Sequence, residues 1–255
     1  MPHAGSRSAA QSPIVVPKRG ERMTIAYFLV YSGAAEYGDA VRSWLKGAPA
    51  ALFKAAPGLE SLDLYVPERA AKDPYLHDGP GPLAMLQAGF GTQKALEAFL
   101  ATPEFRATVV APSPAPPDKV TVVHDAMEQR FYPVAGETKP GPLKAPVSYV
   151  VRYQRPAENE AEFVSFYVSH HPQIQSRFPG IRSIMCYVPI KWSDPTPITP
   201  ASYLLGNEVV FDSVDALEAS LNSPVRHELR EDFKRFPKFS GKNTHYAMRR
   251  TRLAG

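Results

Sequence analysis

The side chains best suited to move a proton stand in the second half of the chain. His170 and His171 are adjacent, and an imidazole changes its charge near neutral pH, so such a ring can act as a general acid or base. His170 shares an apolar stripe with Phe166 and Ile174 at helical spacing, which predicts that its ring faces a sheet. His170 is therefore the candidate catalytic acid or base, the alternative being a core histidine bonded to backbone. His171, off the stripe, is expected at a helix end beside free carbonyls.

Two charged residues stand in the middle of predicted strands. Arg152 interrupts SYVVRY and Glu208 interrupts YLLGNEVVF. A buried charge needs a partner or a charged ligand, because its desolvation costs several kcal/mol. One interpretation is that Arg152 and Glu208 pair with each other. The other is that Arg152 stabilises a developing negative charge while Glu208 orients a histidine, which would make both residues catalytic together with His170.

The chain repeats itself at a spacing of about 122 residues. PGLESLDLYVP at 57–67 returns as PGIRSIMCYVP at 179–189, which is 122 residues later. FGTQKALEAFLATP at 90–103 matches FDSVDALEASLNSP at 211–224, which is 121 residues later. Chance similarity would not hold this register over distant segments, and a loop deletion explains the slip of one residue. We therefore predict two copies of one domain.

Three segments follow from this repeat. Residues 1–22 contain basic residues but lack the apolar core of a secretory signal, which predicts a disordered leader, with Met23 as an alternative start. Residues 23–142 form the first copy, predicted to be degenerate, and its end is rich in Pro and Gly, as is typical of a linker. Residues 143–255 form the second copy, which carries the candidate site.

Each copy is predicted to follow the order β-α-β-β-α-β. For the second copy we expect strands at 148–153, 180–188, 203–211 and 243–251, and helices at 159–177 and 212–221. This is the ferredoxin-like order, an antiparallel sheet with helices on one face, in the α+β class. The bare face would expose a large apolar patch. The two sheets are therefore expected to pack face to face, as a sandwich or closed barrel within one chain.

A short motif precedes the second strand of the second copy. His170-His171-Pro172 is followed by Pro179-Gly180, and this pattern resembles the EthD-like branch of the dimeric α+β barrel superfamily. The first copy departs from it, with Gly47 or Ala48 in the place of the histidine. The resemblance implies an intramolecular α+β barrel and small enzymes without a cofactor that isomerise, dehydrate, decarboxylate or oxidise aromatic, lactone or polyketide-like compounds.

Residues that differ between the copies are better site candidates than residues that they share. The ionisable residues found only in the second copy, each with the first-copy residue that it replaces, are His170 (Ala48), His171 (Pro49), Arg152 (Val30) and Glu208 (Gln87). Further substrate contacts are expected from five side chains: His171, Tyr149, Tyr187, His245 and Trp192, the last of them at a pocket mouth. The tyrosines and His245 have counterparts in the first copy, which favours a role in folding as the alternative.

The composition limits the class of protein. It is 44% hydrophobic and 21% charged, typical of a globular chain, and no segment reaches the roughly 20 apolar residues of a membrane helix. The net charge of +4 comes without the interleaved aromatic residues of a nucleic-acid surface. Lone Cys186 cannot form an internal disulfide, which fits a reducing compartment. We expect a cytoplasmic protein with a small-molecule substrate, with neither nucleic acid nor membrane as partner, and with a homodimer of the tandem unit left open.

The leading functional prediction is an isomerase or lyase. It would move protons on a small aromatic, lactone or polyketide-like carbonyl compound, for example in the catabolism of aromatic compounds, and would need neither cofactor nor metal. Two alternatives stay open. One is a small-molecule binding protein without catalysis, and the other is an oxidase or monooxygenase, either haem-dependent or free of cofactor.

Overall fold

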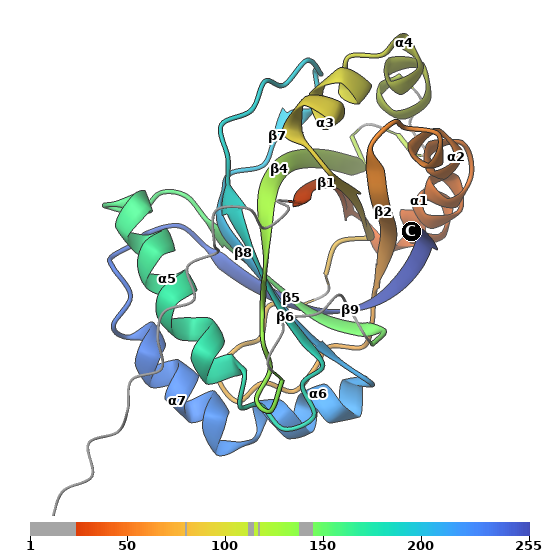
Figure 1. Ribbon diagram of the computed structural model, residues 1–255. Coiled ribbons are helices and arrows are strands. Elements are labelled where there is room, and N and C mark those ends of the chain that lie inside the picture. Colours follow the sequence, from red (N-terminus) through yellow and green to blue (C-terminus); the bar gives the residue numbers. More distant parts are fainter. Residues whose placement is uncertain (1–23, 80, 112–114, 117, 138–144) are drawn as a thin grey trace, which may run out of the picture.

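The structure is a computed structural model that describes residues 24–79, 81–111, 115–116, 118–137 and 145–255. The predicted leader and the predicted boundary between the two copies lie outside the described residues. Figure 1 shows strands that curl into a barrel, with α1 to α4 on one outer side and α5 to α7 on the other.

The elements are named in chain order. The strands are β1 (Thr24–Gly33), β2 (Leu59–Pro67), β3 (Ala84–Phe90), β4 (Val120–Tyr132), β5 (Val147–Gln154), β6 (Ser183–Pro189), β7 (Thr199–Pro200), β8 (Tyr203–Phe211) and β9 (Asn243–Ala254). The helices are α1 (Gly38–Lys46), α2 (Ala48–Lys54), α3 (Gln93–Leu100), α4 (Pro103–Phe105), α5 (Glu160–Gln175), α6 (Val214–Leu221) and α7 (Pro224–Phe233), with short helical turns at Ala35–Tyr37 and Arg106–Val110.

The strands close into an antiparallel barrel. Its order is β1-β3-β2-β9-β5-β8-β6-β4, and β4 pairs with β1 to complete the circle, while the short β7 adds in parallel to β4. Closure matters because it leaves no unpaired edge along the barrel strands. The predicted α+β class and closed barrel are thus confirmed. All these strands belong to one continuous sheet, in which the pairs β2–β9 and β4–β6 connect strands of the two predicted copies.

Two arcs of the barrel have the same strand order. The first arc is β4-β1-β3-β2, and the second arc is β9-β5-β8-β6. Tyr27 pairs with Ala88 in the first arc, and Tyr149 pairs with Val209 in the second. These partners are 122 and 121 residues apart. Positions in the two arcs can therefore be matched through the hydrogen-bonded register.

Alternate residues of each strand face the barrel interior or the outer helices, as the period of two in a strand requires. In β5, Val150 belongs to the apolar cluster inside the barrel. Its neighbours Tyr149 and Val151 belong to the cluster under α5, α6 and α7. A separate cluster lies between the first arc and its helices. Each strand thus contributes to two cores on opposite faces.

The helices of the second arc begin at recognisable caps. The side chain of Asn159 accepts a hydrogen bond from the Glu162 amide at the start of α5, and Ser213 caps α6 in the same way. The prediction did not include α7, which begins with Pro224 at its first position, where a missing amide hydrogen has no cost. This helix covers the second arc together with α5.

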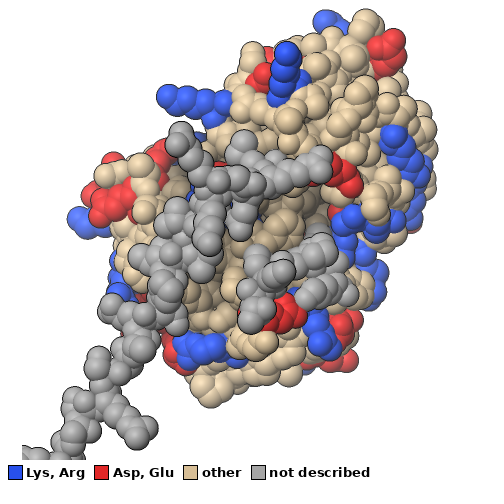
Figure 2. All heavy atoms as spheres, in the orientation of Figure 1, with Lys and Arg blue, Asp and Glu red and all other residues tan. Residues whose placement is uncertain are grey.

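Acidic and basic side chains are interspersed on the face of the molecule that Figure 2 displays. Surface ion pairs among the described residues include that of Arg177 with Glu228, at 2.6 Å. Within the described ranges, no helix combines the length and the apolar character needed to cross a membrane.

Candidate functional site

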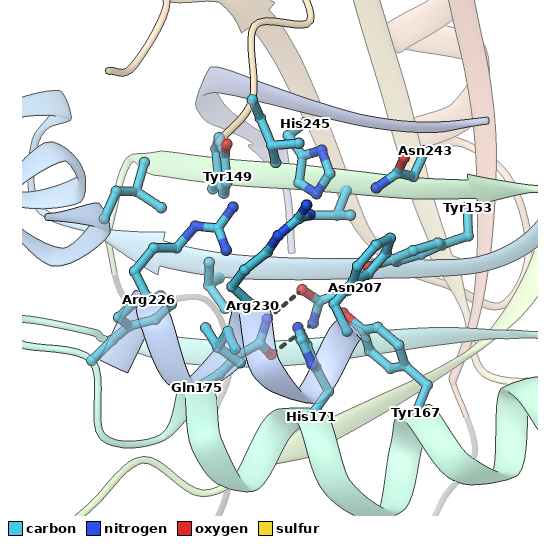
Figure 3. A pocket seen from close by; sticks show the side chains of 17 residues that line it. Tyr149, Tyr153, Tyr167, His171, Gln175, Asn207, Arg226, Arg230, Asn243 and His245 are labelled. Atoms are coloured by element: carbon cyan, nitrogen blue, oxygen red, sulfur yellow. Dashed lines mark hydrogen bonds between the residues drawn. The ribbon is translucent and has the colours of Figure 1, made fainter. Parts of the chain in front are cut away.

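A cavity of about 240 Å³ lies between the second arc and the helices that cover it. We call it the helix-side cavity. Strands β5, β8 and β9 contribute to one side, and α5, α7 and the loop before β3 contribute to the other. The polar and aromatic residues that line it and are labelled in Figure 3 are Tyr149, Tyr153, Tyr167, His171, Gln175, Asn207, Arg226, Arg230, Asn243 and His245.

His171 of α5 is held by Asp232 of α7. The distance from His171 Nδ1 to Asp232 Oδ2 is 2.9 Å, and both side chains are buried. A carboxylate only accepts hydrogen bonds, so Nδ1 carries the proton and Nε2 keeps its lone pair. Burial lowers the pKa of His171 below its ordinary 6.5, although the bond to Asp232 opposes this shift. The imidazole is therefore a neutral base at pH 7.

Two amide side chains form a closed pair on the cavity wall. Gln175 Nε2 donates to Asn207 Oδ1 at 2.8 Å, and Asn207 Nδ2 donates to Gln175 Oε1 at 3.1 Å, as the dashed lines in Figure 3 show. Asn207 also donates to the carbonyl of Met185 at 2.9 Å. This pair fixes α5 on β8 and presents amide groups to the cavity, where hydrocarbon would otherwise be expected.

Two arginines of α7 reach the cavity in different states. Arg226 is clamped by Asp73, with Nε at 2.9 Å from Oδ2 and a second bond of 3.0 Å to Oδ1. The hydroxyl of Tyr149 donates to the same carboxylate at 3.3 Å. Arg230 lies over the rings of Tyr75 and Phe233, and within the described part of the chain no ion pair or hydrogen bond of its guanidinium is found. Arg230 is therefore available to an anionic or polarised oxygen.

His245 of β9 closes the side of the cavity towards the loop before β3. Its Nδ1 lies 3.0 Å from Asp78 Oδ2, and its backbone amide donates to the same oxygen at 2.9 Å. The first arc has the matching arrangement, in which His124 Nε2 lies 2.9 Å from Asp194 Oδ2. In both cases the aspartate comes from the loop of the other half of the chain. Each loop thus binds across to the opposite arc.

The matching region of the first arc is filled with hydrocarbon. The cavity residues His171, Gln175, Asn207, Arg226 and Arg230 are replaced there, at spacings of 122 or 121, by Pro49, Phe53, Leu86, Phe105 and Val109. The ring centroids of Phe53 and Phe105 lie 6.1 Å apart, and both rings pack against the ring of Tyr27. The polar hollow is consequently a feature of the second arc, not of the fold.

The structure separates the two adjacent histidines. His170 is exposed, its ring stacks on Phe166 with centroids 4.4 Å apart, and its Nδ1 lies 2.9 Å from the Phe166 carbonyl oxygen. The expectation that its ring faces the sheet is wrong, because α5 buries the series Phe163, Tyr167, His171 instead. His171, expected at a helix end, lines the cavity.

Arg152 and Glu208 lie inside the barrel, on the opposite face of the sheet from the helix-side cavity. No ion pair joins these two described residues, so the expected pair is absent. Glu208 accepts hydrogen bonds from Ser148 at 2.5 Å and from Tyr187 at 2.7 Å, and no histidine is among its hydrogen-bond partners. Burial raises the pKa of Glu208. The structure thus does not bring His170, Arg152 and Glu208 together.

The predicted substrate contacts divide between three places. His171, Tyr149 and His245 line the helix-side cavity. Tyr187 belongs to the barrel interior. Trp192 packs on the first arc, with its ring centroid 5.5 Å from that of His124, so it does not border the cavity of the second arc.

The cavity residues that the sequence prediction missed include Gln175, Asn207, Arg226 and Arg230. Comparison of the two copies could have found them, because each replaces an apolar residue at the established spacing. Among the described residues, no cluster of three or more His, Cys, Asp or Glu side chains is arranged to hold a metal ion.

Comparisons with known proteins show the fold. No protein-family profile and no curated protein matches the chain. An anthrone oxidase-like protein of known structure is similar over 92% of this chain and 95% of its own, with 12% identity and a TM-score of 0.61. Chlorite dismutase from Candidatus Nitrospira defluvii is similar over 88% and 90%, with 10% identity and a TM-score of 0.49. An EthD family protein from Bacillus halodurans C-125 matches 39% of this chain and 96% of its own, with 17% identity and a TM-score of 0.31. The closed barrel and the first of these likenesses show that the chain shares the fold of this anthrone oxidase-like protein.

Proposed function

We propose that the helix-side cavity is the active site of an enzyme that removes a proton from a carbon atom beside a carbonyl group. The observation that carries this proposal is a buried, neutral His171 whose Nδ1 is bonded to Asp232 and whose Nε2 has no hydrogen-bond partner among the described residues. Such an imidazole is fixed in the tautomer that accepts a proton. The carboxylate of Asp232 then stabilises the imidazolium that forms.

The proton and the electrons have separate destinations in this step. The carbon–hydrogen bond breaks, its proton moves to His171 Nε2, and its electron pair delocalises onto the carbonyl oxygen as an enolate. Arg230 has a free guanidinium at the cavity and can stabilise that oxygen. Arg226 is less suited to this role, because Asp73 already occupies two of its donors.

The size of the cavity limits the substrate. An engineered cavity of about 150 Å³ takes up benzene, so a volume of about 240 Å³ suits a compound of one or two rings. The walls of Tyr149, Tyr153 and Tyr167 favour a planar or aromatic body. A haem is at least drug-sized and such ligands occupy roughly 300–1,000 Å³, so it does not fit this cavity as the side chains lie.

We further propose that the two arcs are two copies of one ferredoxin-like unit, of which the second keeps the site. Their common strand order and register support this view. If His171 returns the proton to another carbon of the enolate, the outcome is an isomerisation. If the enolate instead expels a leaving group with its bonding electron pair, the outcome is that of a lyase. The proposed proton transfer itself requires no cofactor.

The proposal is tested by hydrogen exchange into small carbonyl compounds. The purified protein is incubated in deuterated water with one- and two-ring ketones and lactones, and loss of the proton beside the carbonyl is followed by NMR. We expect at least one compound to exchange faster than in buffer. Because burial lowers the pKa of His171 from its ordinary 6.5, the rate should fall on acidification with a midpoint below pH 6.5. Compounds that bind without any catalysed exchange would favour a binding protein instead, and a rate that already falls above pH 7 as the pH is lowered would contradict the assignment of the base.

A further inference from the structure

A second cavity, of about 450 Å³, lies inside one end of the barrel. We call it the barrel cavity. Its lining residues include Val30, Met85, Val150, Tyr203 and Met248, and its rim includes the exposed residues Ser32 and Ser202. Among the described residues that line it, Arg152 alone is charged. The walls therefore combine apolar and aromatic side chains with uncharged polar groups around a single cation.

The guanidinium of Arg152 is buried, and none of the described carboxylates forms an ion pair with it. The residue is 4% exposed, and its Nε has no hydrogen-bond partner. One terminal nitrogen donates to the carbonyl oxygen of the adjacent Val151 at 2.9 Å, and the other lies 3.8 Å from the sulfur of Met85. The rings of Phe28 and Tyr187 flank it, with centroids at 4.7 and 5.1 Å. These contacts offset only part of the several kcal/mol that burying an unpaired charge costs.

A neighbouring arginine shows how the barrel treats a structural charge. Arg250 Nη1 lies 3.0 Å from Asp63 Oδ1, and both side chains are at most 9% exposed. Arg152 has no such carboxylate within ion-pair distance among the described residues. Glu208 lies in the same interior, but it accepts its hydrogen bonds from the hydroxyls of Ser148 and Tyr187 and forms no ion pair with Arg152 among the described residues. The guanidinium of Arg152 therefore has no direct carboxylate partner there.

The strand beside Arg152 leaves room for its head group. A Cβ atom built on Gly206 would lie 3.1 Å from Arg152 Nη1 and 3.0 Å from Tyr187 Cβ, which is closer than such atoms normally approach. The position in the first arc that matches Arg152 is Val30. Both side chains line the barrel cavity, so at this pair of matched positions only the second arc contributes a charged side chain.

We propose that the barrel cavity binds an organic anion, a carboxylate attached to an apolar body, with Arg152 as its counter-ion. The carboxylate would take the free donor of Arg152 in the planar geometry that a guanidinium favours. The apolar body would contact the methionine and aromatic walls. This site lies on the opposite face of the sheet from the helix-side cavity, so it does not depend on the function proposed above.

The test measures binding of 2-naphthoate and decanoate by isothermal titration calorimetry, with the uncharged 2-naphthamide as the matched probe. We expect at least one carboxylate to bind and the amide to bind at least tenfold more weakly. Arg152→Met should weaken carboxylate binding at least tenfold and raise the melting temperature of the free protein, because an unpaired buried charge is removed. Arg230→Met, which removes a cation from the other cavity, should retain the binding. Preference for naphthoate or for decanoate distinguishes an aromatic acid from a fatty acid.

A second variant tests the same cavity in case Arg152→Met does not fold. Val30→Phe keeps the charge and fills the barrel cavity, and it should also weaken carboxylate binding at least tenfold. The proposal is overturned if neither carboxylate binds, if the amide binds equally well, or if Arg152→Met and Val30→Phe both bind as the wild type does. Loss of binding in Arg230→Met alone would also overturn it, because the anion would then occupy the helix-side cavity.

Discussion

His171→Ala is expected to slow the proposed proton exchange by about 10²–10⁴-fold, which is the usual contribution of a positioned general base. The adjacent His170→Ala should change the rate less than twofold. The two imidazoles differ in place although they are neighbours in sequence, because His171 is buried against Asp232 and His170 is exposed on the far side of α5. The measurement is the initial rate of deuterium incorporation for the best compound of the panel.

The pair of variants provides its own control. Both remove one imidazole from the same helix, so a general loss of helix stability would affect both, and melting temperatures show whether each variant is folded. Asp232→Asn should lower the rate less than His171→Ala does and should shift the acid limb of the pH profile to lower pH, because a carboxylate no longer stabilises the imidazolium. Equal losses in His170→Ala and His171→Ala, or no loss in either, would refute the role assigned to His171.

Asp73→Ala is expected to lower the free energy of unfolding by about 3–5 kcal/mol, the cost of leaving one partner of a buried ion pair alone. Asp73 is 4% exposed and holds Arg226 through two hydrogen bonds of 2.9 and 3.0 Å. It also accepts bonds from the Tyr149 hydroxyl and the Tyr75 amide. Without it the guanidinium stays in a site with little water. Urea unfolding measures the effect as a change in midpoint at constant slope.

A surface pair serves as the comparison for this result. Arg177 and Glu228 are joined at 2.6 Å, but their side chains are 48% and 47% exposed. Glu228→Ala should therefore cost at most about 1 kcal/mol. The double variant Asp73→Leu with Arg226→Leu should recover much of the loss, because no buried charge remains. A loss in Asp73→Ala no larger than that in Glu228→Ala would show that the clamp contributes little to stability.

Local patterns in the sequence predicted most elements of the second arc. The strand expected at 203–211 is β8, Tyr203–Phe211, without a shift, and the helix expected at 159–177 is α5, Glu160–Gln175. Both have strong periodicity and clear ends, so local spacing was sufficient. The α7 helix was not predicted because much of its surface is charged. Its role depends on two long-range contacts, Arg226 with Asp73 and Asp232 with His171, which only the folded chain brings together.

The orientation of α5 could not be predicted from spacing alone. Phe166 is apolar, but it packs against Phe236, which follows α7, with ring centroids 5.8 Å apart. Phe166 is therefore apolar because of this long-range contact, and not because it faces the sheet. As a result, the face of α5 that was predicted to contact the sheet is displaced by about one residue from the observed face. For Arg152 and Glu208, the prediction placed them correctly in strands. It did not use the alternation that puts them on the face opposite to Tyr149.

The loop of each half of the chain contacts the opposite arc, so a fragment of one half does not contain a complete site. Three residues that precede β3 belong to a site whose other residues follow position 145. Leu76 lines the cavity, Asp73 binds Arg226, and Asp78 contacts His245. A fragment that starts at residue 145 would carry His171 but would lack these three supports. A fragment cut at the boundary between the two copies would therefore have an incomplete helix-side cavity, and Arg226 would lack its partner Asp73. Crystallography and ligand screening consequently require both halves, in one polypeptide or supplied together.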